Sequence, residues 1–284
     1  MAYMQDITSQ FKALFIFLLD QSYSMDETIA NGTNRKADQL ALALNAWLYE
    51  MTIVAAKAEG LKDYFDIAIL GYCTDEDGNP IIEPALIGPL AGRELVSISE
   101  VAASPARMDD VIRIMQDDET GEMIEVPEQA PIWIDPKTQG GTPTCSALVK
   151  ACELLDAWIP QHQNSFPPVV INITDGEALD GDPIPYADAV RQRCTDDGNV
   201  LLFNCCLSST PGDPFFFRGN GELMPDQFAQ QLFQMSSIIP DSMREKASLG
   251  GQELEPNARG MVYNGDMVAL VRFLNVGTRP AGLR

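Results

Sequence analysis

Hydrophobic positions follow two different periods along the chain. Short continuous apolar runs, typical of strands buried on both faces, alternate with longer segments in which apolar residues recur every three or four positions, as in helices. The predicted strands are Leu14–Leu19, Tyr64–Tyr72, Pro167–Asp175 and Val200–Leu207, with Ser237–Ile239 as a short edge strand. The predicted helices are Arg35–Ala58, Thr144–Ile159, Asp182–Cys194, Pro225–Met235 and Asn264–Leu274.

Strands that alternate with helices predict an α/β fold with a mostly parallel central sheet and helices on both faces. The segment from Thr74 to Gly141 breaks this rhythm with prolines and turn sequences, so we expect a hairpin-rich insertion there, with Asp117–Glu122 as an acidic tip. No linker-like sequence flanks this segment. We therefore predict a single domain, residues 1–284, with a core at about 12–276, an elaborated segment at 74–141 and a short loose tail at 277–284.

The overall charge narrows the choice of partners. The 284 residues include 19 Lys and Arg against 41 Asp and Glu, which gives a formal net charge of -22. Such a chain repels phosphate backbones and anionic membrane surfaces, so we expect neither nucleic acid nor a membrane as the partner. The first long apolar run, Ala13–Leu19, is too short to span a membrane and has no basic leader or cleavage site beside it. These features predict a cytoplasmic protein.

Cysteine and histidine provide little material for catalysis or for a zinc site. The six cysteines are Cys73, Cys145, Cys152, Cys194, Cys205 and Cys206. They are spread over a large chain without a tight framework, apart from the adjacent pair Cys205 and Cys206, and they form no CxxC motif. We expect buried reduced thiols. The one histidine, His162, follows a predicted helix and is expected to be a solvated loop residue. A serine–histidine relay or a His/Cys zinc site is therefore disfavoured, and we do not expect an enzyme.

Hydroxyl and carboxylate side chains gather where predicted strands end. Asp20 ends the first strand, and Ser22 and Ser24 follow at two-residue steps, so that in an extended loop all three side chains face one way. Asp175 ends a later strand, and Thr142, in "GGTPT", is expected to cap the following helix. Because ligands in open parallel sheets lie at the carboxyl ends of strands, these residues can converge there. Their oxygens suit Mg²⁺, with Mn²⁺ or Ca²⁺ as substitutes.

These residues resemble the metal-ion-dependent adhesion site (MIDAS) of the von Willebrand factor type A (vWA) domain, whose pattern is DxSxS, a distant Thr and a distant Asp. The sequences "DQSYS", "GGTPT" and "ITDGE" fill all five positions in the family's order, and the resemblance spans roughly Leu14 to Leu274. It implies a Rossmann-like, doubly wound sheet with strand order 3-2-1-4-5-6, in which the strands ending at Asp20 and Asp175 are neighbours. It also implies that the serines, and Thr142 in one conformational state, bind the metal directly, and that the aspartates bind directly or through water.

The resemblance implies a metal-dependent protein-interaction module, because the family keeps one coordination position of the cation for a Glu or Asp of a partner protein. The chain is similar to stand-alone bacterial cytoplasmic proteins that work beside AAA+ ATPases or in stress and defence systems. Two alternatives remain open, a Mg²⁺-dependent phosphohydrolase and a scaffold whose metal site is only structural. The first is weakened by Ser22, which stands where the haloacid dehalogenase family has a second aspartate, and by the lack of a Gly-rich phosphate loop.

Three further motifs are expected to be structural. Asp180–Asp182 is expected to cap the next helix, with a place on the rim of the metal face as the alternative. Phe215–Phe217 is expected to be a loop packed on the core, with an exposed contact patch as the alternative. The segment Cys73–Gly78 is rejected as an EF-hand calcium loop, because that alignment puts Pro84 where the bidentate Glu belongs.

Overall fold

A computed structural model describes the chain except for residues 1–2, 31, 57–61, 117–122, 213, 220–223, 250–252, 267–268, 272 and 275–284. The strands are β1 (Ala13–Asp20), β2 (Phe65–Thr74), β3 (Pro80–Pro84), β4 (Val96–Ser97), β5 (Arg107–Gln116), β6 (Met123–Ile132), β7 (Val169–Thr174), β8 (Cys194–Thr195), β9 (Gly198–Asn199), β10 (Leu201–Leu207), β11 (Phe215–Phe216) and β12 (Met261–Gly265). The helices are α1 (Lys36–Ala56), α2 (Ile98–Ala103), α3 (Thr144–Trp158), α4 (Ile184–Gln192), α5 (Gln227–Met235) and α6 (Asp241–Leu249). Three 3-10 turns are η1 (Tyr23–Asp26), η2 (Gly88–Leu90) and η3 (Ile159–Gln161).

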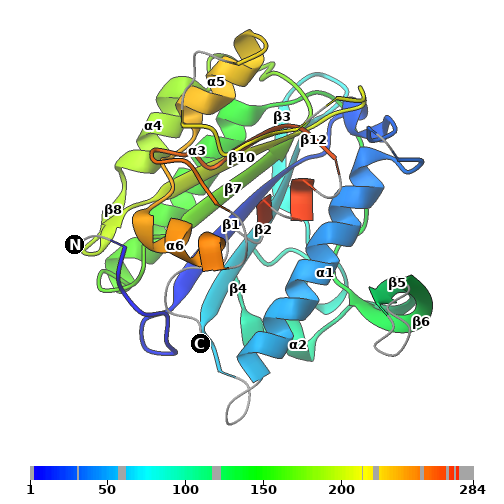
Figure 1. Cartoon of the computed structure of the whole chain (residues 1–284), viewed down its shortest axis with the longest axis horizontal. Coiled ribbons are helices and arrows are strands. Elements are labelled where there is room, and N and C mark those ends of the chain that lie inside the picture. The colour runs from blue at the N-terminus through cyan, green and yellow to red at the C-terminus, as the bar shows by residue number, and fades with distance from the viewer. Residues whose placement is uncertain are drawn as a thin grey trace.

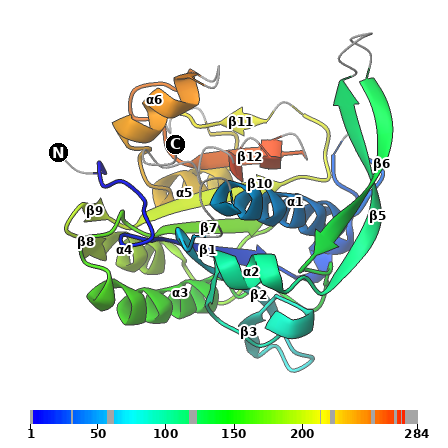
Figure 2. The same ribbon diagram turned by 90° about the horizontal axis from the view of Figure 1, so that it is seen from below.

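An eight-stranded sheet crosses the molecule with helices on both faces, which confirms the predicted α/β class (Figure 1 and Figure 2). Seven strands lie in the order β11-β12-β10-β7-β1-β2-β3, and β4 pairs with β2 beside this path. Neighbours among β2, β1, β7, β10 and β12 run parallel, whereas β3, β4 and β11 are antiparallel to their partners. Without β4 and β11, six strands remain, and from the other edge they read β3-β2-β1-β7-β10-β12. Numbered by their place along the chain, they have the order 3-2-1-4-5-6 that the resemblance implied. The order reverses between β1 and β7.

The central strand β1 is apolar throughout because both of its faces are covered. Its residues Phe15, Phe17 and Leu19 belong to a core shared with α1, α2, α6 and residues 269–270 and 273–274. The alternate residues, among them Ile16 and Leu18, belong to a second core shared with α3, α4 and α5. Side chains alternate across a strand, so a continuous apolar run is what two buried faces require.

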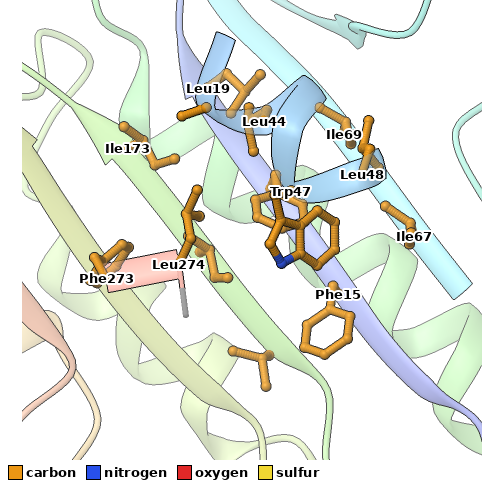
Figure 3. Packing of buried hydrophobic residues seen from close by; sticks show 14 of the residues in the cluster. Phe15, Leu19, Leu44, Trp47, Leu48, Ile67, Ile69, Ile173, Phe273 and Leu274 are labelled. Carbon is orange, nitrogen blue, oxygen red and sulfur yellow. The ribbon is translucent and has the colours of Figure 1, made fainter. Parts of the chain in front are cut away.

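The helix α1 lies across β1 and β2 and presents a periodic apolar face to them (Figure 3). Its Leu44, Trp47 and Leu48 are buried against the sheet. The Trp47 ring centroid lies 5.8 Å from that of Phe15 and 4.8 Å from that of Phe17, both in edge-to-face geometry. Such pairs add about 1 kcal/mol each beyond the buried area. The middle of α1 is thereby fixed on β1.

The prediction of a helix over Asn264–Leu274 was wrong in its first part. Residues 261–265 form β12, which pairs with β10, and helical residues among those described begin only at 269. Asn264 has a positive φ of 57°, which a right-handed helix does not accommodate. The edge strand predicted at Ser237–Ile239 is a single bridge between Ile238 and Arg259. The helix α6 was not predicted.

The segment from Thr74 to Gly141 contains the predicted hairpins. One is β2–β3, whose turn is held by the Asp75 carboxylate, which accepts the Asp77 and Asn79 backbone N–H groups. The other is β5–β6, which extends away from the central sheet (Figure 2). The acidic tip predicted at Asp117–Glu122 and the tail at 277–284 lie outside the described residues.

The cysteines are all free, as predicted, and five of the six are buried, whereas Cys194 is exposed. His162 differs from the expected solvated residue. Its ring stacks on Trp158 at a centroid distance of 4.0 Å, and its Nδ1 lies 2.9 Å from the Trp158 carbonyl oxygen. None of the helices in the described part of the chain combines the length and the apolar character that a membrane span requires.

Candidate metal centre

Asp20 ends β1 as a buried carboxylate held in one orientation. Its side chain is among the least exposed polar groups of the chain, at 1% for the residue. Oδ1 accepts the Ser22 backbone N–H at 2.8 Å, and Oδ2 accepts the Thr174 hydroxyl at 2.7 Å. Burial raises the pKa of Asp20 to about 6, although the hydrogen bonds from Ser22 and Thr174 pull in the opposite direction. A cation at this place would offset the cost of burying the charge.

The two serines follow Asp20 in a 3-10 turn rather than in the extended loop that was predicted. Ser22 has extended backbone angles and stands at the N-cap of η1, which contains Ser24. The two hydroxyl oxygens are nevertheless 3.0 Å apart. Ser24 also donates its hydroxyl to Asp175 Oδ1 at 2.6 Å, a contact between residues 151 positions apart in sequence. The loop after β1 therefore meets the end of β7 through side-chain oxygens.

Asp175 is also paired with a lysine that the sequence did not indicate as part of the site. The Lys36 Nζ lies 2.6 Å from Asp175 Oδ2, and both side chains are buried, at 3% and 0% exposure. Lys36 further donates to Glu27 Oε2 at 3.0 Å and to the Ser24 carbonyl oxygen at 3.2 Å. Asp175 thus offers Oδ1 to the serine side and Oδ2 to the ammonium group.

Backbone hydrogen bonds hold the segment Gly140–Thr142 between the loop after β1 and the loop after β7. The Gly140 carbonyl accepts the Tyr23 N–H at 2.9 Å, and the Thr142 carbonyl accepts the Leu179 N–H at 2.9 Å. No hydrogen bond joins the Thr142 hydroxyl to the other four predicted ligands, all of which are among the described residues. The structure therefore links Asp20, Ser22, Ser24 and Asp175 directly and brings Thr142 to the loops around them.

Gly140 allows this segment to pass close to the end of β2. Its φ is +61°, and a Cβ at this position would lie 2.2 Å from the Thr74 carbonyl oxygen. The next residue, Gly141, donates its backbone N–H to the Thr74 hydroxyl oxygen at 2.8 Å. A left-handed conformation and a close backbone approach both require glycine here.

The prediction that Thr142 caps the helix was wrong. The N-cap of α3 is Pro143, and no side chain of its own segment caps the helix. Instead, the Asp180 carboxylate accepts the Cys145 and Ser146 backbone N–H groups at 3.0 and 2.8 Å. A carboxylate at a helix N terminus satisfies unpaired donors and complements the helix dipole. These hydrogen bonds hold the loop after Asp175 against the first turn of α3.

The other residues of "DGD" and the aromatic cluster also differ in part from expectation. Asp182 accepts the Ile184 N–H at 3.1 Å and so supports the start of α4, as predicted for this motif. Phe215 and Phe216 form β11 on the sheet edge rather than a loop. Phe217 is buried in the core and stacks on Phe273 at 6.3 Å, which agrees with packing rather than with an exposed patch.

The donor set fits a hard divalent cation. Within the described part of the chain, no group of three or more His, Cys, Asp or Glu side chains is placed to hold a metal ion, so any site here depends on hydroxyl ligands as well. Two carboxylates and three hydroxyls are oxygen donors of the kind that Mg²⁺, Mn²⁺ and Ca²⁺ accept. The metal ligand assignment itself stays a prediction from the sequence.

A cavity of about 230 Å³ opens beside Asp175, over the carboxyl ends of β10 and β12. Its lining residues are Glu27, Lys36, Asp175, Cys206, Leu207, Ser208, Ser209, Thr210, Phe228, Tyr263 and Asn264. The Phe228 and Tyr263 rings meet in edge-to-face geometry at 6.1 Å, and Ser209 donates its hydroxyl to Glu27 at 2.6 Å. The cavity leaves space for groups of another molecule next to Asp175.

Comparison with known proteins finds similarity to solved structures. No family model matches the chain, and no curated protein matches it. The manganese-loaded TRAP protein of Plasmodium vivax shares 12% identity over 98% of this chain and 75% of its own, with a TM-score of 0.45. The PilB minor pilin of Streptococcus sanguinis shares 11% over 96% and 62%, with a TM-score of 0.47. The ArnB paralog VWA2 of Sulfolobus acidocaldarius shares 13% over 69% and 35%, with a TM-score of 0.31. These are similarities of fold alone.

Proposed function

We propose that this chain is a metal-ion-dependent protein-interaction module. Asp20, Ser22, Ser24, Thr142 and Asp175 hold a divalent cation, which we take to be Mg²⁺, with Mn²⁺ or Ca²⁺ as substitutes. When bound, the cation supplies a directional, positively charged contact for a carboxylate of another protein. The observation that carries the proposal is the 2.6 Å hydrogen bond from the Ser24 hydroxyl to Asp175, which brings distant oxygen donors together at the carboxyl edge of the sheet.

The charges at the centre support this reading. The ligand set contains two carboxylates and three neutral hydroxyls, and Lys36 lies 2.6 Å from one of the carboxylates. The two ligand carboxylates and the Lys36 ammonium sum to a charge of about -1, and Glu27, which shares this ammonium, is 61% exposed and screened by solvent. A divalent cation held there therefore keeps part of its positive charge. A Glu or Asp side chain on the partner can then complete the coordination.

The chemistry around the centre favours binding over catalysis. Ser22 contacts Ser24, and Ser24 contacts Asp175. No histidine is near these serines, because His162 follows the far end of α3. The helix begins beside the centre at Thr144 and its 15 residues span about 22 Å. A phosphohydrolase would need an acid/base where Ser22 stands. Metal-dependent phosphatase turnover that is lost in Asp20→Ala would support that alternative.

Co-purification from the native host tests the proposal. The full chain and Asp20→Ala serve as baits, each in Mg²⁺ and in EDTA, with Asp156→Ala as a control on the far end of α3, where Asp156 pairs with Arg193. We expect a partner that is retained by the wild type and by the control in Mg²⁺, and that is lost in EDTA and with Asp20→Ala. A partner held equally well without metal would contradict the proposal.

The partner is proposed to be a protein with an accessible acidic residue, for instance an AAA+ ATPase or a component of a stress or defence system in the cytoplasm. A scaffold with a purely structural metal is the second candidate. It predicts that Mg²⁺ binds the wild type and raises its melting temperature. It also predicts that the wild type and Asp20→Ala bind the partner equally well under conditions in which both proteins are folded.

A further inference from the structure

Two bulky apolar side chains stand exposed on the loops that carry candidate ligands. Tyr23, between the two serines, is 69% exposed, and Leu179, four residues after Asp175, is 73% exposed. These are the highest values among the large hydrophobic residues of the described chain, and the next is 56% at Met4. Single exposed apolar residues are ordinary on protein surfaces. Here the two most exposed ones flank the same candidate centre.

The backbone fixes both residues beside the segment Gly140–Thr142. Tyr23 donates its N–H to the Gly140 carbonyl, and Leu179 donates its N–H to the Thr142 carbonyl, each at 2.9 Å. The Leu179 side chain covers Gly141, where an added Cβ would lie 2.9 Å from Leu179 Cδ1. Tyr23 and Leu179 are therefore tied to the two ends of the three-residue segment that carries Thr142.

Exposed carboxylates surround this area. The side chains of Asp26 and Glu27 are 58% and 61% exposed and pair with Arg35 and Lys36. Glu177, Asp180 and Asp182 are exposed on the other loop and add further negative charge. The chain as a whole carries a formal charge of -22. A partner can give one carboxylate to a cation, but further acidic residues would meet like charges at close range.

We propose that Tyr23 and Leu179, together with the candidate metal centre, form a docking surface for a protein segment with one acidic residue, bulky apolar neighbours and nearby Lys or Arg. The inference rests on the proposed function and specifies its partner. One carboxylate contact covers little surface, and a few buried side chains, most often Trp, Tyr or Arg, carry most of the binding energy of protein interfaces, with apolar neighbours that exclude water around them. The two exposed side chains supply this apolar part, and the carboxylate rim selects basic flanks.

A random peptide library displayed on phage provides the probe. The full chain is immobilised in Mg²⁺, and bound phage are eluted with EDTA. We expect the eluted peptides to share one Asp or Glu next to a bulky apolar residue, with an excess of Lys and Arg elsewhere. Peptides with several clustered acidic residues would overturn the inference about charge.

Substitutions then locate the contact. Tyr23→Ser and Leu179→Ser are compared with Ile53→Ser, a control that is 43% exposed and lies 17 residues, or about 25 Å, along α1 from Lys36. We expect each test substitution to weaken binding of the selected peptides by about tenfold or more, and the control by less than about twofold. Mg²⁺ affinity, measured by calorimetry on each protein, stays within about twofold of the wild type because none of these side chains is a candidate ligand.

The outcomes separate the inference from the proposed function. EDTA-eluted peptides that bind Tyr23→Ser and Leu179→Ser as tightly as the wild type overturn the docking surface and leave the metal-dependent module standing. Loss of Mg²⁺ affinity in these two variants would also overturn it, because the side chains would then support the centre itself. A library that yields no EDTA-eluted peptide contradicts both proposals.

Discussion

Lys36 brings a positive charge into a site for which the sequence predicted only oxygen donors. The residue stands four positions before Leu40 and eight before Leu44 on the buried face of α1, so its side chain points toward the sheet. It reaches Asp175, Glu27 and the Ser24 carbonyl oxygen. The spacing along the helix places a lysine on an apolar face, and this is the signal in the sequence for a buried positive charge.

Lys36→Met should destabilise the metal-free protein and increase its response to metal. Removing one partner of a buried ion pair leaves Asp175 with an uncompensated charge, which costs about 3 kcal/mol. A divalent cation supplies the missing charge, so Mg²⁺ should raise the melting temperature more in Lys36→Met than in the wild type. Calorimetric unfolding in EDTA and in Mg²⁺ measures both effects.

Lys150→Met is the matched control, since Lys150 pairs with the partly exposed Glu94 and Glu153 and such pairs contribute less than about 1 kcal/mol. An equal Mg²⁺-induced rise in melting temperature for Lys36→Met and the wild type would contradict the role given to Lys36.

The raised pKa of Asp20 predicts that the free energy of unfolding of the metal-free protein depends on pH. Its pKa in the folded state, about 6, lies above the ordinary value of 3.8, so the folded state holds the proton more tightly than the unfolded chain. The stability that the protonated group contributes is present below about pH 4 and is lost as the pH rises through about 6. The loss amounts to roughly 3 kcal/mol.

Asp20→Asn cannot ionise, so its free energy of unfolding should lack this component. Urea unfolding of both proteins in EDTA between pH 4 and pH 7 gives the comparison. We expect the stability of the wild type relative to Asp20→Asn to fall across this range. A difference that does not change with pH would show that Asp20 is ionised in both states throughout.

At the scale of elements, the segment before α3 depends on Gly140. Gly140→Ala must place a Cβ 2.2 Å from the Thr74 carbonyl at a positive φ, so the segment has to move. Gly78→Ala also has a positive φ, of +83°, but nothing lies within 4 Å of its Cβ. We expect Gly78→Ala to cost about 1 kcal/mol from backbone strain alone.

Gly140→Ala should cost more than Gly78→Ala and should also weaken Mg²⁺ binding by about tenfold, because Thr142 is displaced. Thermal unfolding and Mg²⁺ calorimetry on both variants measure the two effects. Identical Mg²⁺ affinities would indicate that the position of this segment does not matter to the centre.

Asp180 joins the loop after β7 to the first turn of α3. Asp180→Ala should lower the free energy of unfolding by about 1–2 kcal/mol, since two backbone donors lose their partner. It should also weaken Mg²⁺ binding, whereas Asp182→Ala, which removes a contact at the start of α4, should not. Urea unfolding and Mg²⁺ calorimetry test the pair, and equal Mg²⁺ affinities for both variants would contradict the coupling.

The elements that the sequence pattern predicted well are those with long periodic runs. β1, β7 and β10 are buried on both faces, and α1 and α3 carry long apolar faces, so each has a strong signal. The features that were not predicted are short elements or contacts between residues far apart in the sequence. β12 has five residues and takes its partner from β10, and the cap of α3 comes from Asp180, 35 positions away from Cys145. Neither relation is visible in a local pattern.

At the scale of the whole molecule, the sheet assembles the candidate centre. β1 pairs with β7 in parallel, with Leu19 opposite Ile173, so Asp20 and Asp175 emerge on the same edge where the strand order reverses. Sequence motifs predicted that five residues converge here, and hydrogen bonds link four of them, Asp20, Ser22, Ser24 and Asp175. The position of Thr142 and the involvement of Lys36 depend on tertiary contacts. One of these is at buried Asn45, which accepts the Trp133 and Ile134 backbone N–H groups, donates to the Ile134 carbonyl oxygen, and so anchors the chain leading to Gly140.

Titration calorimetry of the EDTA-stripped full chain with MgCl₂ and MnCl₂ tests the central claim most directly. Ser24→Ala is compared with Ser242→Ala, because Ser242 lies on α6 and donates its hydroxyl to the Tyr3 carbonyl oxygen, away from the centre. We predict one cation per wild-type chain, unchanged affinity for Ser242→Ala, and affinity at least about tenfold weaker for Ser24→Ala. The absence of a binding heat in the wild type, or equal affinity in Ser24→Ala, would contradict the account.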